Sequence, residues 1–268
     1  MQPMVNIALR GARIAGEQIA RAVERLDLIK SEQSSVSDFF EETCKQAEKA
    51  IASTIQKAYP DHEVNGEFTG QHAAESTPAI TWQVNPIDST SNFANGVPVF
   101  ALSVAGYQRG RLEHAIVLNP MNGEEFTASR GRGAQCNGKR LRVSNLKTLQ
   151  GALIASNYFG RNQKQHLESF QRVFSNITLE DGSIYNAGSP VLNMAYTAAG
   201  RFDGFFQFGM KGADMAAGTL LIQESGGLLS DFNGGNSHAQ NGNLIVGNPK
   251  MLKALLKSIH PAVSDELK

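Results

Sequence analysis

The chain has 268 residues, of which 41% are hydrophobic, so it can bury a substantial core as one large domain or two smaller ones. Its 25 basic residues balance its 25 acidic residues, and the resulting net charge of zero gives no global field that favours nucleic acid, an anionic membrane or an acidic substrate. Any such binding therefore requires a local patch.

The N-terminal segment predicts two helices. Apolar residues recur at helical spacing from Met4 onward and predict an amphipathic helix that ends near Leu26. Because arginines and glutamates lie within this pattern, we expect neither a secretory signal nor a transit peptide. A second helix is expected to follow Ser37-Asp38 and to end before Pro60.

The pattern then changes to strands. The segments ITWQV, FALSVAGYQ, RLEHAIVLN and EEFTASR are separated by turn sequences such as NGVP and NPMNGE, which predicts an antiparallel meander. Asn137-Gly138 is a hairpin signal in the segment that closes this half. We predict that residues 1–144 form an N-terminal α+β half, which carries this sheet and the candidate metal loops.

Residues 145–268 predict a C-terminal α/β half that completes the site. Short buried strands alternate with helices here, which is typical of a mixed α/β arrangement. The expected helices cover residues 162–177, 189–201 and 213–227, and the expected strands cover residues 151–157, 202–208, 228–232 and 243–248.

The most informative stretch is the polar loop that follows the strand over residues 80–84. Asp88 and Thr90 place a carboxylate and a hydroxyl just past a buried strand end, where α/β proteins often present groups that meet a metal or a phosphate. The same residue types also form an ordinary Asx-turn after Pro86. The loop alone leaves both interpretations open.

Other polar residues also have two interpretations. Asp214, at the start of a predicted helix, is either its N-cap or a ligand for a metal. Glu67 is either a solvated acid in a glycine-flanked loop or part of a site. Gly188-Ser189 opens a helix and either caps it or lets its backbone amides approach an anion, and Gln207 is a polar residue at a strand end.

The remaining motifs exclude several chemistries. No G-x-G-x-x-G or P-loop sequence occurs, the histidines belong to no nucleophile motif, and Cys44 and Cys136 lack metal, redox or disulfide spacing. One basic cluster is either a solvated hairpin face or a contact for protein or RNA, although it lacks the aromatic residues of a single-strand binder. Its members are Arg130, Arg132, Lys139, Arg140 and Arg142.

Taken in order, several segments resemble the inositol monophosphatase family, and within it the bacterial SuhB-type branch. They include QPMVNIALRGARIAG, NPIDSTSNF, EEFTASRGRGAQCNGKRLRVS, GSPVLNMAYTAAGRFDGFF and DMAAGTLLIQESGG, and they span essentially the whole chain. The resemblance implies a layered α-β-α-β-α sandwich and Mg²⁺-dependent hydrolysis of small phosphate monoesters.

The resemblance also assigns roles to residues. It implies that Glu67 and Thr90 position the attacking water. The implied Mg²⁺ ligands are Glu67, Asp88, Asp214, the backbone carbonyl of Ile87 and, at the position that bridges two ions, Asn85. The implied substrate contacts are Ser89, Thr90, Gly188, Ser189 and Gln207.

Departures from the family pattern gather at the metal site. Asn85 stands where the family has a bridging Asp, and an amide brings no charge to two cations. Phe68 replaces a second acid, Cys44 replaces the carboxylate that orients the Thr90 hydroxyl, and Ser89 replaces a glycine that faces phosphate. We expect at most one weakly held Mg²⁺.

We therefore expect a catalytically impaired member with a regulatory or binding role. By resemblance this role is antitermination of ribosomal RNA transcription, with RNA polymerase and its elongation factors as partners, in a cytoplasmic homodimer that binds no membrane. The alternative is an active Mg²⁺-dependent phosphatase acting on inositol 1-phosphate or a similar monoester. A third possibility is binding of a phosphate metabolite without turnover.

Overall fold

The computed structural model describes residues 2–32, 35–157 and 164–268. It contains two compact units, Met1–Arg132 and Gly133–Lys268, whereas the sequence analysis placed its boundary between residues 144 and 145. The hairpin at Asn137-Gly138 thus falls in the second unit. Within the described part of the chain, no helix has the length and apolar character needed to cross a membrane.

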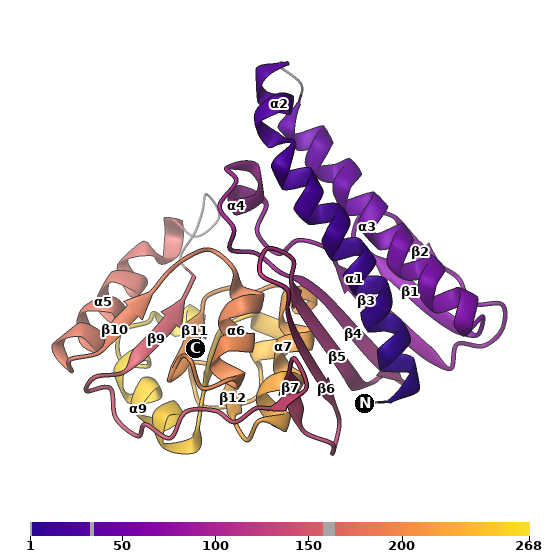
Figure 1. Ribbon diagram of the computed structural model, residues 1–268. Coiled ribbons are helices and arrows are strands. Elements are labelled where there is room, and N and C mark those ends of the chain that lie inside the picture. The colour runs from indigo at the N-terminus through magenta and orange to yellow at the C-terminus, as the bar shows by residue number, and fades with distance from the viewer. Residues whose placement is uncertain (1, 33–34, 158–163) are drawn as a thin grey trace. The chain divides into compact units, whose positions relative to one another are not determined.

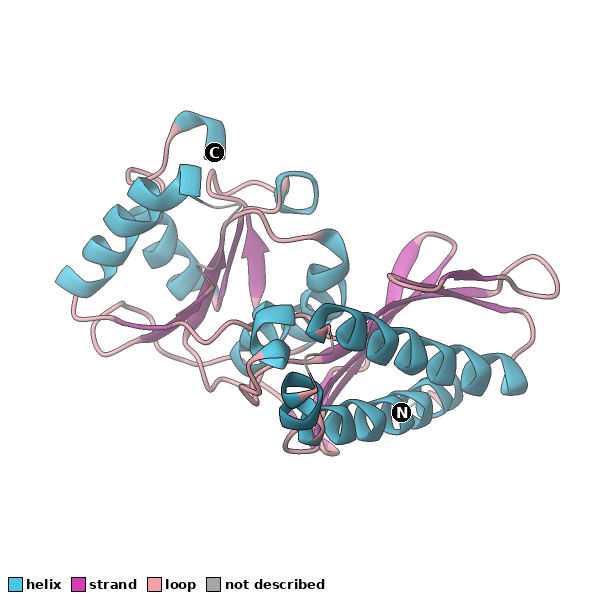
Figure 2. Ribbon diagram, turned by 90° about the horizontal axis from the view of Figure 1, so that it is seen from above, coloured by secondary structure: helices cyan, strands magenta, loops and turns pink. Residues whose placement is uncertain are grey.

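The helices of the first unit are α1 (Pro3–Glu24), α2 (Leu26–Ser31), α3 (Val36–Ala58) and α4 (Thr90–Ala94). Pro3 stands in the first turn of α1, where its missing N–H costs nothing. Ser35 caps α3, because its Oγ accepts a hydrogen bond from the Asp38 N–H at 3.1 Å. The long helices α1 and α3 lie side by side against the sheet (Figures 1 and 2).

Within the first unit the strands follow the order β2-β1-β3-β4-β5-β6. Neighbouring strands from β3 to β6 are antiparallel, which confirms the predicted meander, whereas β1 pairs parallel to β3 with His62 opposite Ile80. The large buried side chains of this unit include Trp82 and Phe93. The bounds are β1 His62–Gly66, β2 Gly70–His72, β3 Ile80–Asn85, β4 Leu102–Gln108, β5 Arg111–Asn119 and β6 Glu124–Ser129.

The second unit opens with the predicted hairpin, formed by β7 (Ala134–Cys136) and β8 (Lys139–Arg140). Asn137 and Gly138 both have positive φ, 47° and 79°, as the favoured two-residue turn requires. A sheet of order β10-β9-β11-β13-β12 follows, in which β9 pairs parallel to both β10 and β11. The strands are β9 Leu153–Ser156, β10 Ser183–Tyr185, β11 Gly204–Gln207, β12 Leu228–Ser230 and β13 Leu244–Gly247.

Two pairs of helices build the core of the second unit. Helices α5 and α9 contribute to one apolar cluster with Ile154, Phe206 and Ile245 of the sheet, while α6 packs against α7. Residues 162–163 of the helix predicted over 162–177 lie outside the described residues. The helical segments are η1 Lys164–His166, α5 Leu167–Leu179, α6 Pro190–Ala198, α7 Gly212–Glu224, α8 His238–Asn241, α9 Pro249–Ile259 and η2 Asp265–Leu267.

Candidate functional site

The loop after β3 is fixed by reciprocal bonds to the chain that leads into β4. The Asp88 N–H donates to the Ala101 carbonyl at 3.1 Å, and the Asp88 Oδ1 accepts from the Ala101 N–H at 2.8 Å. Asn85 is the last residue of β3 and is buried opposite Ser103 of β4. The Ile87 side chain lies in the apolar core, so its backbone carbonyl is the group it can offer.

Ser89 and Thr90 form the start of a short helix. Ser89 is the N-cap of α4, and its Oγ accepts from the Asn92 N–H at 3.4 Å. Thr90 is the first residue of α4 and is exposed. The serine in place of the family's glycine thus has a local structural role, because it satisfies a backbone donor at the helix start.

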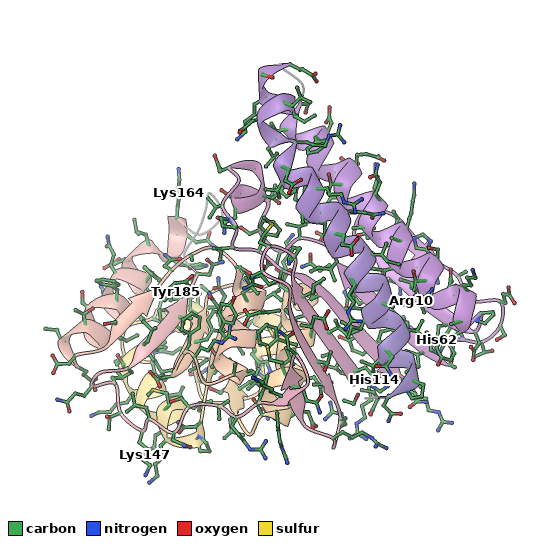
Figure 3. All side chains as sticks on the ribbon, in the orientation of Figure 1. Arg10, His62, His114, Lys147, Lys164 and Tyr185 are labelled. Atoms are coloured by element: carbon green, nitrogen blue, oxygen red, sulfur yellow. The ribbon has the colours of Figure 1, made fainter. Side chains whose placement is uncertain are left out.

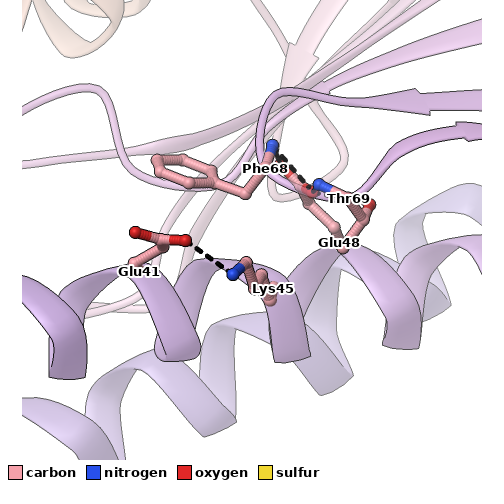
Figure 4. A network of polar contacts seen from close by, with 5 residues as sticks. All are labelled: Glu41, Lys45, Glu48, Phe68 and Thr69. Carbon is pink, nitrogen blue, oxygen red and sulfur yellow. Dashed lines mark hydrogen bonds and ion pairs between the residues drawn. The ribbon is translucent and has the colours of Figure 1, made fainter.

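Glu67 lies in the turn between β1 and β2, and a buried carboxylate beneath this turn holds it in place. Glu48 of α3 is fully buried and accepts from the N–H groups of Phe68 at 3.0 Å and Thr69 at 2.7 Å (Figure 4). It also accepts from the Thr69 hydroxyl at 2.7 Å. A Cβ on Gly66 would lie 2.2 Å from Glu48 Oε2, so this arrangement requires glycine there.

Phe68 belongs to an aromatic cluster. Its ring meets that of Phe40 edge-on at a centroid distance of 5.9 Å, and Phe40 contacts Phe93 in the same way at 5.4 Å. Phe68 also packs against the apolar core of the first unit. The side chain that replaces the family's second acid therefore contributes to packing.

On α3, Cys44 stands where the resemblance implies a carboxylate, and its environment differs from that of Glu41 one turn earlier. Cys44 is fully buried, and burial together with the nearby Glu48, Glu67 and Glu41 carboxylates raises the pKa of its thiol far above the usual range. The neutral thiol brings no charge to a cation. Glu41 is exposed and forms an ion pair with Lys45 (Figure 4).

In the second unit, Gly188 and Ser189 begin α6. The Ser189 Oγ accepts from the Leu192 N–H at 3.2 Å, and Pro190 occupies the first turn, so the predicted capping role is confirmed. Gly188 has a φ of 98°, which a residue with a side chain rarely adopts. Both residues are buried at the N-terminal end of α6.

Gln207 and Asp214 lie on two elements of the second unit that follow each other in sequence, β11 and α7. Gln207 ends β11, and its Nε2 donates to the backbone carbonyls of Asn157 at 2.7 Å and Phe208 at 3.1 Å. Asp214 lies in the first turn of α7, but the N-cap is Lys211. The capping interpretation of Asp214 was therefore wrong, because the helix begins at Gly212, before the predicted start.

The predicted donor set lacks the charged bridge of a two-cation centre. Glu67, Asp88 and Asn85 belong to the first unit and Asp214 to the second, so the predicted ligand set draws on both units. At the position that the resemblance assigns to a bridge between two cations, Asn85 offers a neutral amide in place of a charged oxygen ligand. Across residues 2–32, 35–157 and 164–268, no three His, Cys, Asp or Glu side chains group to hold a metal.

Glu48 is a site residue that the sequence pattern did not single out. The sequence does contain a signal for a buried role of Glu48, because an acid interrupts the apolar stripe of a helix there. Glu48 lies on the buried face of α3 with Cys44 and Ile51. A buried acid requires hydrogen-bond donors. The pattern of α3 alone does not say that the turn at residues 67–69 supplies them.

Comparisons with known proteins identify the class. The architecture is the layered α+β fold of inositol monophosphatases. It superposes on the SuhB crystal structure from Bartonella henselae with a TM-score of 0.86 and 28% identity, over 98% of this chain and 100% of that one. The model of the inositol monophosphatase family matches residues 1–264, and the chain belongs to that family.

Two curated relatives place the chain among its SuhB-type members. Both are named Nus factor SuhB: the protein from Pseudomonas aeruginosa is 47% identical and that from Escherichia coli is 42% identical. Each comparison covers 100% of this chain and 100% of the relative. The family is generally Mg²⁺-dependent.

Proposed function

We propose that this protein is a catalytically impaired SuhB-type factor that acts through binding in transcription antitermination. The packing of Phe68 carries the proposal. Where the family pattern has an acid, this side chain lies against Phe40 and the apolar core. Phe68 is half-buried, so an acid in its place would lose these contacts and set a charge beside apolar side chains.

The chemistry of the remaining donors supports impaired turnover. Two-metal hydrolysis needs both ions, one to activate water and one to stabilise the leaving oxygen. Loss of even a residue that only orients a metal ligand typically lowers affinity or activity by about 10 to 100-fold. Here the bridging position itself is an amide, Asn85, and neutral Phe68 and Cys44 replace two further acids.

The names of the relatives support the regulatory role. The Pseudomonas aeruginosa and Escherichia coli proteins are both called Nus factors. A role of this kind needs a folded surface and no hydrolysis. The proposed partners are RNA polymerase and its elongation factors, and the proposed state is a cytoplasmic homodimer.

A phosphatase assay tests the catalytic half of the proposal. With inositol 1-phosphate and Mg²⁺, we expect the wild type to stay far below about 1 turnover per second, the low end of typical enzymes. Asn85→Asp is expected to raise turnover at least about tenfold, since it restores a charged bridge. Asn95→Asp, which adds the same charge at an exposed position, is the matched control. Wild-type turnover of about 1 per second or more would refute impairment.

The substitution Phe68→Glu is tested in a double variant with Asn85→Asp. The stability of this double variant is measured alongside its turnover. Because Phe68 packs on Phe40, the acid is expected to lower the free energy of unfolding by about 1–3 kcal/mol. Melting temperatures separate an unfolded variant from a folded, inactive one. A folded double variant without any gain in turnover would show that more than the ligand acids has changed.

A binding assay tests the regulatory half. We expect the purified protein to form a complex with RNA polymerase and its elongation factors, and Asn85→Asp to bind as tightly as the wild type. Equal affinities would separate binding from the metal site. Failure of the wild type to join a complex assembled from purified components would refute this role.

Two observations favour the active-phosphatase alternative. Asp88 is held in place by Ala101, and Gly188-Ser189, the substrate contact that the resemblance implies, opens α6. Calorimetric titration with Mg²⁺ or Mn²⁺ tests it directly. No binding up to tens of millimolar would exclude this alternative, while tight binding by the wild type would favour it.

A further inference from the structure

A groove of about 440 Å³ opens between α1 and α3, on residues that have no part in the candidate site. Its volume lies within the usual range for small-ligand pockets, about 300–1,000 Å³. Figure 3 labels Arg10, which contributes to the groove from α1. The lining consists of Ile7, Arg10, Ser53, Thr54, Lys57 and Ala58.

The groove lies beside a close contact between the two helices. Gly11 allows this contact, since a Cβ there would lie 3.2 Å from Ile51 Cα and 3.3 Å from Thr54 Cβ. Arg10 adjoins this glycine in sequence, and Thr54 both faces it and lines the groove. Tightly packed helices therefore give the groove rigid walls.

The charge of the groove is unbalanced. Arg10 and Lys57 both line it, and no acid does. Within the described part of the chain neither cation forms an ion pair, whereas Arg13 on α1 pairs with Glu125 at 2.6 Å. Two other cations of these helices are also paired, Arg21 with Glu17 and Lys45 with Glu41, whereas the exposed Lys49 outside the groove has no ion pair among the described residues. An anion in the groove would relieve the repulsion between its two cations.

The other lining groups define the rest of the ligand. The hydroxyls of Ser53 and Thr54 both donate to the Ala50 carbonyl, at 3.2 and 2.7 Å, so the two cations supply the attraction for an anion. Ile7 and Ala58 add apolar surface. We propose that this groove binds a small organic anion, with its phosphate or carboxylate between Arg10 and Lys57 and its apolar part against Ile7 and Ala58.

The site is tested with phenyl phosphate by methyl NMR on the full chain. Isotope-labelled isoleucine and alanine methyl groups report locally, so binding elsewhere leaves the Ile7 and Ala58 signals unchanged. At constant ionic strength we expect saturable shifts of these signals, with a Kd on the order of 1 mM. Inorganic phosphate is expected to bind more weakly, because it lacks the apolar part, and benzoate tests whether a carboxylate suffices.

The decisive comparison uses two double variants of equal charge. Arg10→Gln/Lys57→Gln is expected to weaken phenyl phosphate binding at least tenfold. Arg21→Gln/Lys49→Gln removes two exposed cations from the same helices outside the groove and is expected to leave the Kd unchanged. The proposal is overturned if the Ile7 and Ala58 signals do not shift up to about 20 mM ligand, or if both variants bind like the wild type.

Discussion

Glu48 connects α3 to the turn that carries Glu67. Its carboxylate accepts two backbone N–H groups and the Thr69 hydroxyl, and the same hydroxyl lies 2.8 Å from His72 Nε2. Hydrogen bonds to a charged group contribute more than neutral ones, about 1.5–3 kcal/mol each. A single side chain thus sets the conformation of the whole turn.

We expect Glu48→Gln to lower the free energy of unfolding by about 2–3 kcal/mol, since the amide turns a donor toward backbone donors. Urea denaturation measures the change. The control is Glu42→Gln on the exposed face of α3, which should change stability by less than about 0.5 kcal/mol. Equal effects of the two substitutions would contradict the role assigned to Glu48.

A second residue-scale feature surrounds Trp82, the only tryptophan of the chain. Its Nε1 donates to His62 Nδ1 at 3.0 Å, so His62 accepts in its neutral form. His114 stacks on the Trp82 ring, and its Nδ1 lies 3.0 Å from Ser129 Oγ. Burial lowers the pKa of both histidines, although Asp61 and Glu113 respectively act in the opposite direction.

These pKa shifts predict lower stability in acid. Because the folded pKa values lie below the unfolded value of about 6.5, the unfolded chain takes up protons first as the pH falls. The contribution of these two histidines to the free energy of unfolding should be constant above about pH 7 and decrease as the pH falls below about 6.5. Denaturation followed by Trp82 fluorescence measures it.

The control for the acid effect is His62→Asn, which keeps an acceptor for Trp82 but does not titrate. We expect a smaller loss of stability between pH 7.5 and 5.5 in this variant than in the wild type. An unchanged pH dependence would show that His62 does not contribute.

At the scale of elements, Asn248 joins α9 to the start of the second unit. Its Oδ1 caps α9 by accepting from the N–H groups of Lys250 and Met251, at 2.9 and 3.0 Å. Its Nδ2 donates to the carbonyls of Ser144 and Leu146, at 2.9 and 2.6 Å. The Asn248 side chain therefore caps the start of α9 and also anchors the segment at residues 144–146 to it.

The two functions of Asn248 can be separated. Asn248→Ala should lower the free energy of unfolding by about 2–3 kcal/mol, because it loses the cap and leaves both carbonyls without their donor. Asn248→Asp keeps the cap and should lose roughly half as much. Thermal denaturation compares the three proteins, and equal losses in both variants would show that the cap contributes nothing.

Most elements with a strong local pattern were predicted from the sequence, and helix α9 is the exception. The meander and the Asn137-Gly138 hairpin are confirmed, since alternation and turn residues act over a few positions. Helix α9 was not predicted, although its Asn248-Pro249 start and its buried Met251 and Leu255 are visible in the sequence. The parallel β1–β3 pairing was also missed, because no local pattern specifies it.

At the scale of the whole molecule, the zero net charge limits binding to nucleic acid. The predicted basic cluster is also less uniform than the sequence indicates, since Arg130 donates to the Leu112 carbonyl and pairs with Glu113 at 3.7 Å. Lys139 and Arg140 are exposed on the hairpin. Without stacking aromatics, these cations supply only a weak, salt-dependent attraction.

We therefore expect the protein alone to bind single-stranded RNA of about 20 nucleotides with a Kd weaker than about 10 μM at physiological salt. Fluorescence anisotropy measures it. The variant Lys139→Glu/Arg140→Glu should weaken this binding further and reduce its salt dependence, because these cations supply part of the attraction. Submicromolar binding that the variant abolishes would instead identify the hairpin as an RNA contact.

The sequence by itself determined the family, most of the segments that form helices and strands, and the loops that carry Glu67 and Asp88. It also located the departures at Asn85 and Phe68, because these are properties of short ordered segments. Only the tertiary structure decided that Phe68 packs into an aromatic cluster and that Glu48 holds the turn beside it. These contacts join residues about 20 positions or more apart, and no local pattern encodes such pairings.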